Sequence, residues 1–178
     1  MRGIKKLESE EILTRWRSNR PKERFPLTLL LDNLRSAYNV GSIFRTAECA
    51  FIERIILCGI TATPPHPGIA KTALGTTERV PWHHEPSTLY AVEKLKRKGY
   101  TVASLELTNR SIPIQQLERP YFPLALVIGN EVTGVAEEVL ENSHLIVDIP
   151  LFGEKESLNV AVATAVALFL LLEKIKQG

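Results

Sequence analysis

Short apolar runs of strand length alternate along this chain with segments whose apolar residues have helical spacing. Five runs are nearly continuous in apolar residues: 27–31, 54–58, 100–105, 124–128 and 145–149. Such runs are typical of parallel strands that are covered on both faces. The alternation predicts an α/β fold whose mostly parallel sheet is flanked by helices. A length of 178 residues suits one compact domain.

The helices are predicted from apolar spacing and from turn residues. A polar helix is expected at 8–19, an apolar-striped helix follows 27–31, and the longest helix is expected at 157–176. The proline-rich stretch 61–68 is expected to form a loop, followed by one helical turn at 70–75. Ligands of parallel sheets bind beyond the carboxyl ends of the strands. The loops after residues 31, 105, 128 and 149 are therefore the most informative ones.

The charge is unevenly distributed. Residues 1–24 carry eight basic and four acidic side chains, a charge of +4, whereas the whole chain carries +2. We interpret residues 1–26 as a basic N-terminal helical extension and residues 27–178 as the folded domain. A basic arm can bind phosphate groups, and a solvated helix with a linker explains the same charges equally well.

The cysteines and the apolar runs indicate the compartment. Cys49 and Cys58 lie in apolar stretches without a zinc-binding spacing, so we expect buried free thiols in a reducing compartment. The start of the chain lacks the apolar segment of a signal peptide. The longest apolar run, 160–172, is shorter than the roughly 18 residues that a membrane span needs. We therefore expect a cytoplasmic protein with no membrane partner.

Several common motifs are missing from the sequence. No Gly-x-Gly-x-x-Gly follows the first expected strand, which argues against a Rossmann dinucleotide site. Gly129 and Gly134 have the spacing of P-loop glycines, but no Lys-Ser or Lys-Thr pair follows them. His83 and His84 are adjacent and lack an acidic or cysteine cluster, so we expect no bound metal.

Three stretches at the ends of expected strands stand out. They are residues 39–48 (NVGSIFRTAE), residues 126–134 (LVIGNEVTG), and residues 149–153 (IPLFG) with 157–163 (SLNVAVA). In this order, with matching elements between them, they resemble the three signature motifs of the SpoU (TrmH-like) family within the SPOUT methyltransferase superfamily. The resemblance covers the chain from about residue 27 to its C-terminal end.

This resemblance implies a fold, a reaction and an assembly. The C-terminal segment is expected to form a deep trefoil knot, a rare exception among protein chains. The implied reaction transfers a methyl group from S-adenosylmethionine to a ribose 2′-hydroxyl of RNA without a metal, and leaves S-adenosylhomocysteine. A homodimer through the C-terminal helix is also implied. The small apolar residues of 160–167 agree with such an interface and with burial inside the domain.

Arg45 is the residue that the resemblance places near the target ribose. It lies off the apolar stripe of Val40, Ile43, Phe44 and Ala47, so it can point toward a substrate or simply be an exposed helix arginine. The pKa of an arginine side chain lies above about 12, so the guanidinium stays protonated and is a poor base. Orienting the hydroxyl and stabilising its developing charge is physically easier.

Four further residues are placed at the active site by the resemblance. Asn39 is expected just before a helix, where it can act as the N-cap, fix Arg45 or touch the ribose. Glu131 either helps to arrange the site or is a solvated turn carboxylate. Ser157, the expected N-cap of the last helix, and Asn159 complete this group. The cofactor is expected to contact Leu105, Gly129, Asn130, Ile149, Leu151, Ser157 and Leu158.

RNA contacts are expected from Arg45 and from Arg15, Arg17 and Arg20 in the basic arm. The resemblance also implies that Lys71 lies near the RNA entry, where it can contact a phosphate, and a plain surface lysine explains this residue equally well. We favour tRNA over rRNA, because rRNA members of the family often carry an additional N-terminal RNA-binding domain. Only about 26 residues precede the first expected strand here. The alternatives are the same chemistry on rRNA, a non-catalytic RNA-binding protein of this fold, methylation of a base nitrogen, and a purely structural dimerisation domain.

Overall fold

In the computed structural model, which describes residues 4–176, seven strands form one sheet in the order β3-β2-β1-β6-β4-β7-β5. Every pair of neighbouring strands is parallel. The strands are β1 (Phe25–Asp32), β2 (Ile52–Cys58), β3 (Trp82–Glu85), β4 (Thr101–Leu105), β5 (Ile112–Pro113), β6 (Leu124–Ile128) and β7 (Leu145–Asp148). The predicted α/β fold with a mostly parallel sheet is thus confirmed.

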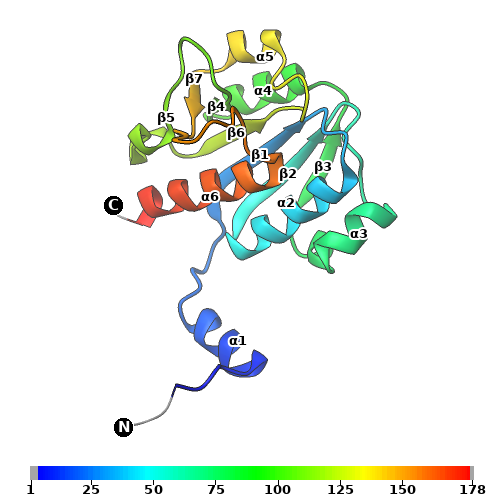
Figure 1. Ribbon diagram of the computed structural model, residues 1–178, viewed down its shortest axis with the longest axis vertical. Coiled ribbons are helices and arrows are strands. Elements are labelled where there is room, and N and C mark those ends of the chain that lie inside the picture. Colours follow the sequence, from blue (N-terminus) through cyan, green and yellow to red (C-terminus); the bar gives the residue numbers. More distant parts are fainter. Residues whose placement is uncertain (1–3, 177–178) are drawn as a thin grey trace.

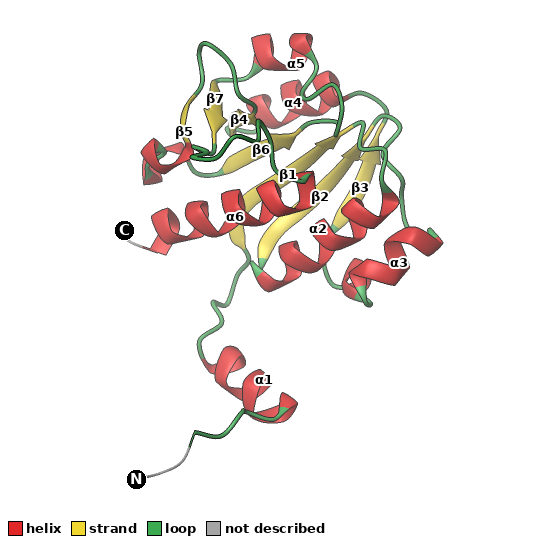
Figure 2. Cartoon of the chain, in the orientation of Figure 1, coloured by secondary structure: helices red, strands yellow, loops and turns green. Residues whose placement is uncertain are grey.

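Helices cover both faces of the sheet (Figure 2), with α2, α3 and α6 on one face and α4 and α5 on the other. The described helices are α1 (Ser9–Ser18), α2 (Ala37–Cys49), α3 (Pro67–Ala73), α4 (Thr88–Arg97), α5 (Glu137–Asn142) and α6 (Val160–Lys176). Three 3-10 turns are η1 (Thr76–Glu78), η2 (Ile114–Gln116) and η3 (Arg119–Tyr121).

The core explains why the apolar runs are continuous. In β1, Leu27, Leu29 and Leu31 pack beneath α2 and α6, whereas Leu30 packs beneath α4 on the opposite face. All four side chains are fully buried. Because successive side chains of a strand point to opposite faces, a strand covered on both sides is buried along its length and is mostly apolar; in β1, Thr28 and Asp32 are the buried polar residues. The trefoil knot implied by the resemblance stays a prediction.

Several elements differ from the sequence-based expectation, among them β5, a two-residue strand that was not predicted, and α6, which begins at Val160 instead of residue 157. The strand β3 was not predicted, because Trp82–Glu85 (WHHE) is a short polar edge strand without an apolar run. The predicted turn at 70–75 is instead the seven-residue helix α3, which begins at Pro67. His66 caps this helix by accepting a hydrogen bond from Gly68 N, and proline is well tolerated at a first helical position.

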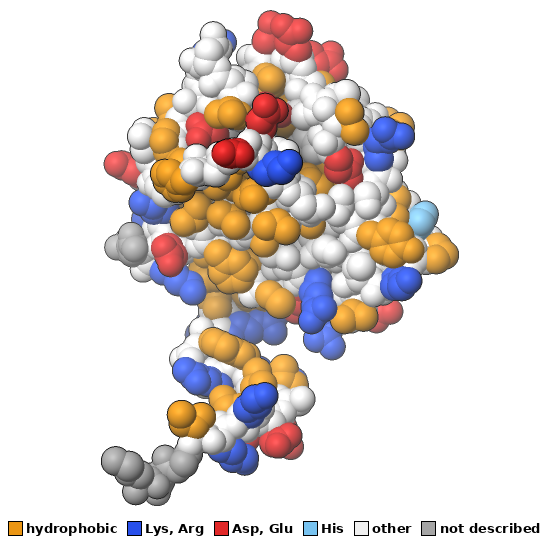
Figure 3. Space-filling model, in the orientation of Figure 1, with side chains coloured by type: hydrophobic (Ala, Val, Ile, Leu, Met, Phe, Trp, Pro, Cys, Tyr) orange, Lys and Arg blue, Asp and Glu red, His pale blue; other side chains and the backbone are white. Residues whose placement is uncertain are grey.

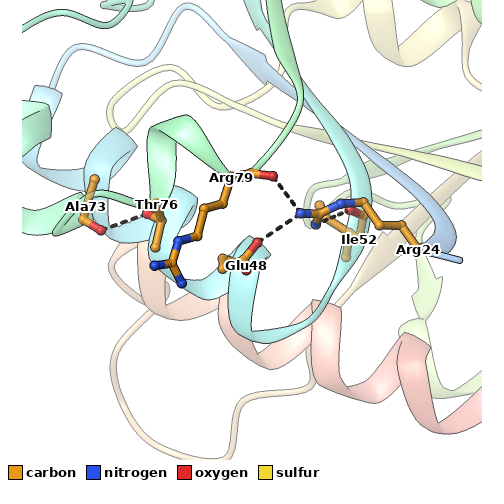
Figure 4. Close-up of polar contacts among 6 residues, drawn as sticks. All are labelled: Arg24, Glu48, Ile52, Ala73, Thr76 and Arg79. Carbon is orange, nitrogen blue, oxygen red and sulfur yellow. Dashed lines mark hydrogen bonds and ion pairs between the residues drawn. The ribbon is translucent and has the colours of Figure 1, made fainter. Parts of the chain in front are cut away.

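The N-terminal helix α1 stands apart from the rest of the chain (Figure 1) and has no buried residue. Its link to the domain is anchored at Arg24 (Figure 4). The Arg24 guanidinium donates to the Ile52 carbonyl at 3.0 Å, to Glu48 Oε2 at 3.0 Å and to the Arg79 carbonyl at 2.6 Å. The arm is therefore fixed to the domain at its root.

The two cysteines differ from each other. Cys58 is buried, and its burial raises the pKa of the thiol to about 12. The prediction that Cys49 is also buried was wrong, because this last residue of α2 falls outside the buried stripe that ends at Ala47. Among the described residues, no helix is both long and apolar enough to cross a membrane.

Candidate active site

A cavity of about 990 Å³ opens at the carboxyl ends of β4, β6 and β7. Its lining comes from the segments that follow these strands, residues 105–107, 128–134 and 148–160, and from Ala163 of α6. Three of the four loops that the parallel sheet predicted to be informative therefore meet at one place. All seven residues expected to contact a cofactor line the cavity: Leu105, Gly129, Asn130, Ile149, Leu151, Ser157 and Leu158.

The loop after β6 closes tightly on itself. Asn130 and Gly134 exchange two backbone hydrogen bonds of 3.0 Å, and Asn130 Oδ1 accepts from Val132 N at 2.9 Å. A Cβ added at Gly129 would overlap the backbone of Gly134 and Val135. A glycine is thus required at position 129 because the loop's own backbone fills the space that a side chain would occupy.

Glu106 ties this loop to the end of β4, and sequence reasoning missed it. Its Oε2 accepts from Val135 N at 2.9 Å and its Oε1 from Leu107 N at 3.0 Å, while the side chain lines the cavity. Its position in the loop after residue 105 was the only available signal. The pairing with Val135, 29 residues away, cannot be read from the sequence.

Glu131 connects the β6 loop to the start of α2. Its carboxylate accepts from Arg35 N at 2.9 Å, from Ser36 N at 3.0 Å and from Asn39 Nδ2 at 3.0 Å. Burial raises the pKa of Glu131, but hydrogen bonds from Arg35, Asn39 and Ser36 outweigh it, so that its pKa lies below the usual value. The ionised carboxylate also suits the positive end of a helix dipole.

Asn39 joins the first motif to the third. Its Oδ1 accepts from Asn159 Nδ2 at 3.3 Å, while its Nδ2 donates to Glu131. Glu131, Asn39 and Asn159 therefore form one polar chain across the three motifs. Among the described residues, no hydrogen bond joins Asn39 to Arg45, the partner that we had considered for its amide.

Both expected helix caps were wrong by a few residues. The N-cap of α2 is Ser36, whose hydroxyl accepts from Asn39 N at 3.3 Å, and Asn39 lies inside the first turn. The start of α6 is capped by Asn159, whose Oδ1 accepts from Ala161 N at 2.9 Å. Ser157 instead lies in the exposed loop before the helix and lines the cavity. Both asparagines thus combine a helix end with a contact between motifs.

The remaining predicted site residues lie away from this cavity. Arg45 is exposed on α2 and is not among the described residues that line the cavity. Lys71 is on α3, Arg15 and Arg17 are on α1, and the Arg20 guanidinium lies 3.8 Å from the centre of the Phe51 ring. Within residues 4–176, no group of three His, Cys, Asp or Glu side chains is placed to hold a metal ion.

Comparison with known proteins connects this geometry to a family. The family model described as SpoU rRNA Methylase family matches residues 26–169. A protein of Staphylococcus haemolyticus, named as a TrmH family tRNA/rRNA methyltransferase, is 29% identical over 160 residues, which are 90% of this chain and 64% of that protein. The chain thus spans slightly less than two thirds of this curated relative.

Solved structures show the same fold. The AdoMet-bound rRNA methyltransferase of Sinorhizobium meliloti aligns with a TM-score of 0.75 and 28% identity, over 85% of this chain and 56% of that one. The TrmH/SpoU tRNA modifying enzyme of A. aeolicus aligns with a TM-score of 0.80 and 23% identity, over 94% of this chain and 84% of that one. The region that the family model matches, residues 26–169, contains all three motifs and the whole sheet except Phe25, the first residue of β1.

Proposed function

The chain belongs to the SpoU rRNA methylase family, and from this membership we propose that it methylates a ribose 2′-hydroxyl of RNA, with S-adenosylmethionine as the methyl donor. The observation that carries the proposal is the polar chain from Glu131 through Asn39 to Asn159. It joins three segments that are far apart in the sequence, and two of its members, Glu131 and Asn159, line the cavity.

The lining of the cavity suits such a cofactor in polarity and in charge. Leu105, Ile149, Leu151 and Leu158 offer apolar contacts for an adenine ring. Of the charged residues that line the cavity, five are acidic and one is basic, which favours a ligand with positive charge: Glu106, Glu131, Asp148, Glu154, Glu156 and Lys155. S-adenosylmethionine, when bound, supplies a methyl group on a sulfonium that becomes a neutral thioether.

The protein's own residues have to hold the RNA ribose in line with that donor and to assist removal of the hydroxyl proton. Glu131 already accepts three hydrogen bonds, so we assign it to positioning α2 and Asn39 rather than to proton transfer. Ser157 and Asn159, at the rim of the cavity, are the groups that we propose to contact the ribose. Arg45 is proposed to orient the hydroxyl and to stabilise its developing charge.

A homodimer would explain how Arg45 reaches the substrate. Val162, Val166 and Phe169 form an exposed apolar stripe on α6, with 51%, 37% and 51% exposed. Hydrophobic side chains gather over α6 in Figure 3. We propose that two copies pair through this stripe. Because α2 packs beside α6, Arg45 would then lie next to the interface and approach a ribose at or across it.

Methyl transfer tests the proposal directly. The full chain is incubated with labelled S-adenosylmethionine and either unfractionated tRNA or rRNA, and the methylated positions are mapped by resistance to alkaline hydrolysis, which a 2′-O-methyl group confers. Both RNA classes occur in the name of the Staphylococcus relative. We propose tRNA as the substrate, with rRNA as the alternative. We also propose that the enzyme acts in the cytoplasm. Label on base nitrogens, or in neither RNA, would contradict the proposal.

A substitution at Arg45 separates chemistry from cofactor binding. We expect Arg45→Ala to keep its affinity for S-adenosylmethionine and to lose about 100-fold in turnover, because it removes a group that stabilises charge. Arg97→Ala is the matched control, since Arg97 is an exposed arginine of α4 on the opposite face of the sheet. Equal turnover of the two variants would contradict the role of Arg45.

A further inference from the structure

An exposed tyrosine and a lysine lie together beside the polar chain of Glu131, Asn39 and Asn159. Tyr38 immediately precedes Asn39 in α2 and is 53% exposed. The ammonium group of Lys71, in α3, lies 5.7 Å from the centre of the Tyr38 ring. Such a cation is attracted to the face of an aromatic ring, which keeps the two side chains together. Figure 3 shows hydrophobic and basic side chains next to one another over α3.

The two helices that carry this pair are in direct backbone contact. A Cβ added at Gly41 of α2 would overlap Thr72 Oγ1 and the Ile69 carbonyl of α3. The Thr72 hydroxyl also donates to the Tyr38 carbonyl at 2.9 Å. This bond uses the main chain of Tyr38, so the ring itself is left available to a ligand. Replacing the ring would leave the contact between the helices intact.

The charge of Lys71 is also available. Among residues 4–176, no carboxylate forms an ion pair with Lys71. A second tyrosine–lysine pair in the chain lacks this property. Tyr90 is 50% exposed and lies 5.8 Å from Lys94, but Lys94 donates to Glu85 at 2.6 Å. That pair belongs to α4, on the other face of the sheet.

We propose that Tyr38 and Lys71 form an RNA-docking platform at the entrance of the active site. The Tyr38 ring stacks on an unpaired base next to the target nucleotide, and Lys71 contacts a phosphate of the same strand. Single-stranded nucleic acids are commonly held by this combination of an aromatic face and a nearby cation. A base inside a duplex is already stacked on its neighbours and cannot use the ring. The platform therefore selects single-stranded RNA, and this inference rests on the proposed function.

The test compares two forms of one RNA. A fluorescently labelled single strand of mixed sequence, and the same strand annealed to its complement, are titrated with the full chain by anisotropy in the absence of cofactor. We expect Tyr38→Ala to bind the single strand about 5- to 150-fold more weakly, the range found for loss of one stacked base, and to bind the duplex unchanged. We expect Tyr38→Phe to bind both forms like the wild type.

Two further variants complete the experiment. Lys71→Gln should lower the slope of log affinity against log salt concentration by about one, because one phosphate contact is lost. Tyr90→Ala is the matched control and should leave both affinities unchanged. Thermal melts of each variant establish that it is folded.

Three results would overturn the platform. They are single-strand binding by Tyr38→Ala at wild-type affinity, an equal loss on single strand and duplex, and a change in sedimentation that shows the ring to be a contact between copies of the chain. The outcome is separable from the proposed function. RNA binding through Tyr38 without methyl transfer would contradict the proposed function alone. Methyl transfer by Tyr38→Ala at an unchanged KM for RNA would contradict the platform alone.

Discussion

The cavity has one wall that is held by hydrogen bonds and one that is not. The first wall consists of residues 129–135. Asn130 and Gly134 pair within this loop, the Glu106 carboxylate ties the loop to the end of β4, and the Glu131 carboxylate ties it to the start of α2. In the second wall, residues 150–158, all side chains but that of Pro150 are exposed. No residue of this second wall forms a hydrogen bond with another residue of the described chain.

Because only the first wall is held by hydrogen bonds, the two walls contribute differently to the free energy of ligand binding. The first wall is already ordered, so a ligand that binds there loses little affinity to loop ordering. The second wall is connected only through β7 and through Asn159 at the start of α6, and few buried contacts oppose its local opening. We therefore infer that shape selection resides in the first wall, and that the second wall takes its final arrangement around the ligand.

The largest expected effect comes from Gly129→Ala in the first wall. The added methyl group would overlap the backbone of Gly134 and Val135, so the loop must shift. We expect loss of measurable S-adenosylmethionine binding by calorimetry and a fall of about 2 kcal/mol in the free energy of unfolding, as for an overpacked core.

Gly153→Ala is the matched control in the second wall, where an added Cβ would meet no atom within 4 Å. It should keep both cofactor affinity and stability. If Gly153→Ala abolished binding as completely as Gly129→Ala, the distinction between the walls would fail.

Hydrogen exchange should separate the two walls without any substitution. At a concentration of S-adenosylmethionine about 100 times its Kd, amides that open only in the free protein should exchange about 100-fold more slowly. We expect this slowing for residues 151–158 and little change for residues 130 and 132–135, whose amides are already hydrogen-bonded. Equal slowing in both walls would mean that the first wall is not preorganised.

An apolar contact of the second wall is expected to affect binding but not folding. Leu158 lines the cavity and is 40% exposed, so Leu158→Ala should change the free energy of unfolding by less than about 0.5 kcal/mol. Its affinity for S-adenosylmethionine should fall by roughly fivefold, since about 1 kcal/mol of apolar burial is lost.

Phe152→Ala is the control for Leu158, because Phe152 belongs to the same wall but is 99% exposed and does not line the cavity. We expect calorimetry to give it wild-type affinity. A comparable loss of affinity in both variants would show that the whole segment, and not the lining residue, determines binding.

Local pattern was enough to predict the elements that form the cavity. The strand Leu124–Ile128 was predicted with its observed bounds, because a fully buried central strand has no polar position. The loops after residues 105, 128 and 149 follow from the rule for parallel sheets, and they do line the cavity. The resemblance of the three motifs to a known family then indicated individual site residues within these loops.

The contacts between these loops could not be predicted in the same way. Glu131 accepts a hydrogen bond from Arg35 N, 96 residues away in the sequence, and Asn159 donates one to Asn39, 120 residues away. No local propensity encodes such a pairing, which is why Asn39 was expected to be a cap and Glu106 was missed. The strand β3 was overlooked for a related reason, since an edge strand lacks the apolar run of a central one.

The smallest expected effect concerns the charge of Glu131, the anchor of the first wall. Hydrogen bonds from Arg35, Asn39 and Ser36 place its pKa in the folded protein below the usual value, despite partial burial. A lowered pKa stabilises the fold above the pKa of the unfolded chain, near 4.3 for glutamate, and this contribution is lost as the pH falls through the folded value.

At neutral pH, Glu131→Gln should therefore unfold more easily than the wild type by about 0.5 kcal/mol, a small figure because most of the side chain remains in contact with solvent, which screens its charge. The difference, followed by denaturant titration, should shrink as the pH falls below the usual glutamate pKa. Glu154→Gln, in the second wall, removes a carboxylate without a hydrogen bond in the described chain and should show no difference at neutral pH. A Glu131→Gln difference that persists at acidic pH would mean that the shape of the side chain, and not its charge, holds the first wall to α2.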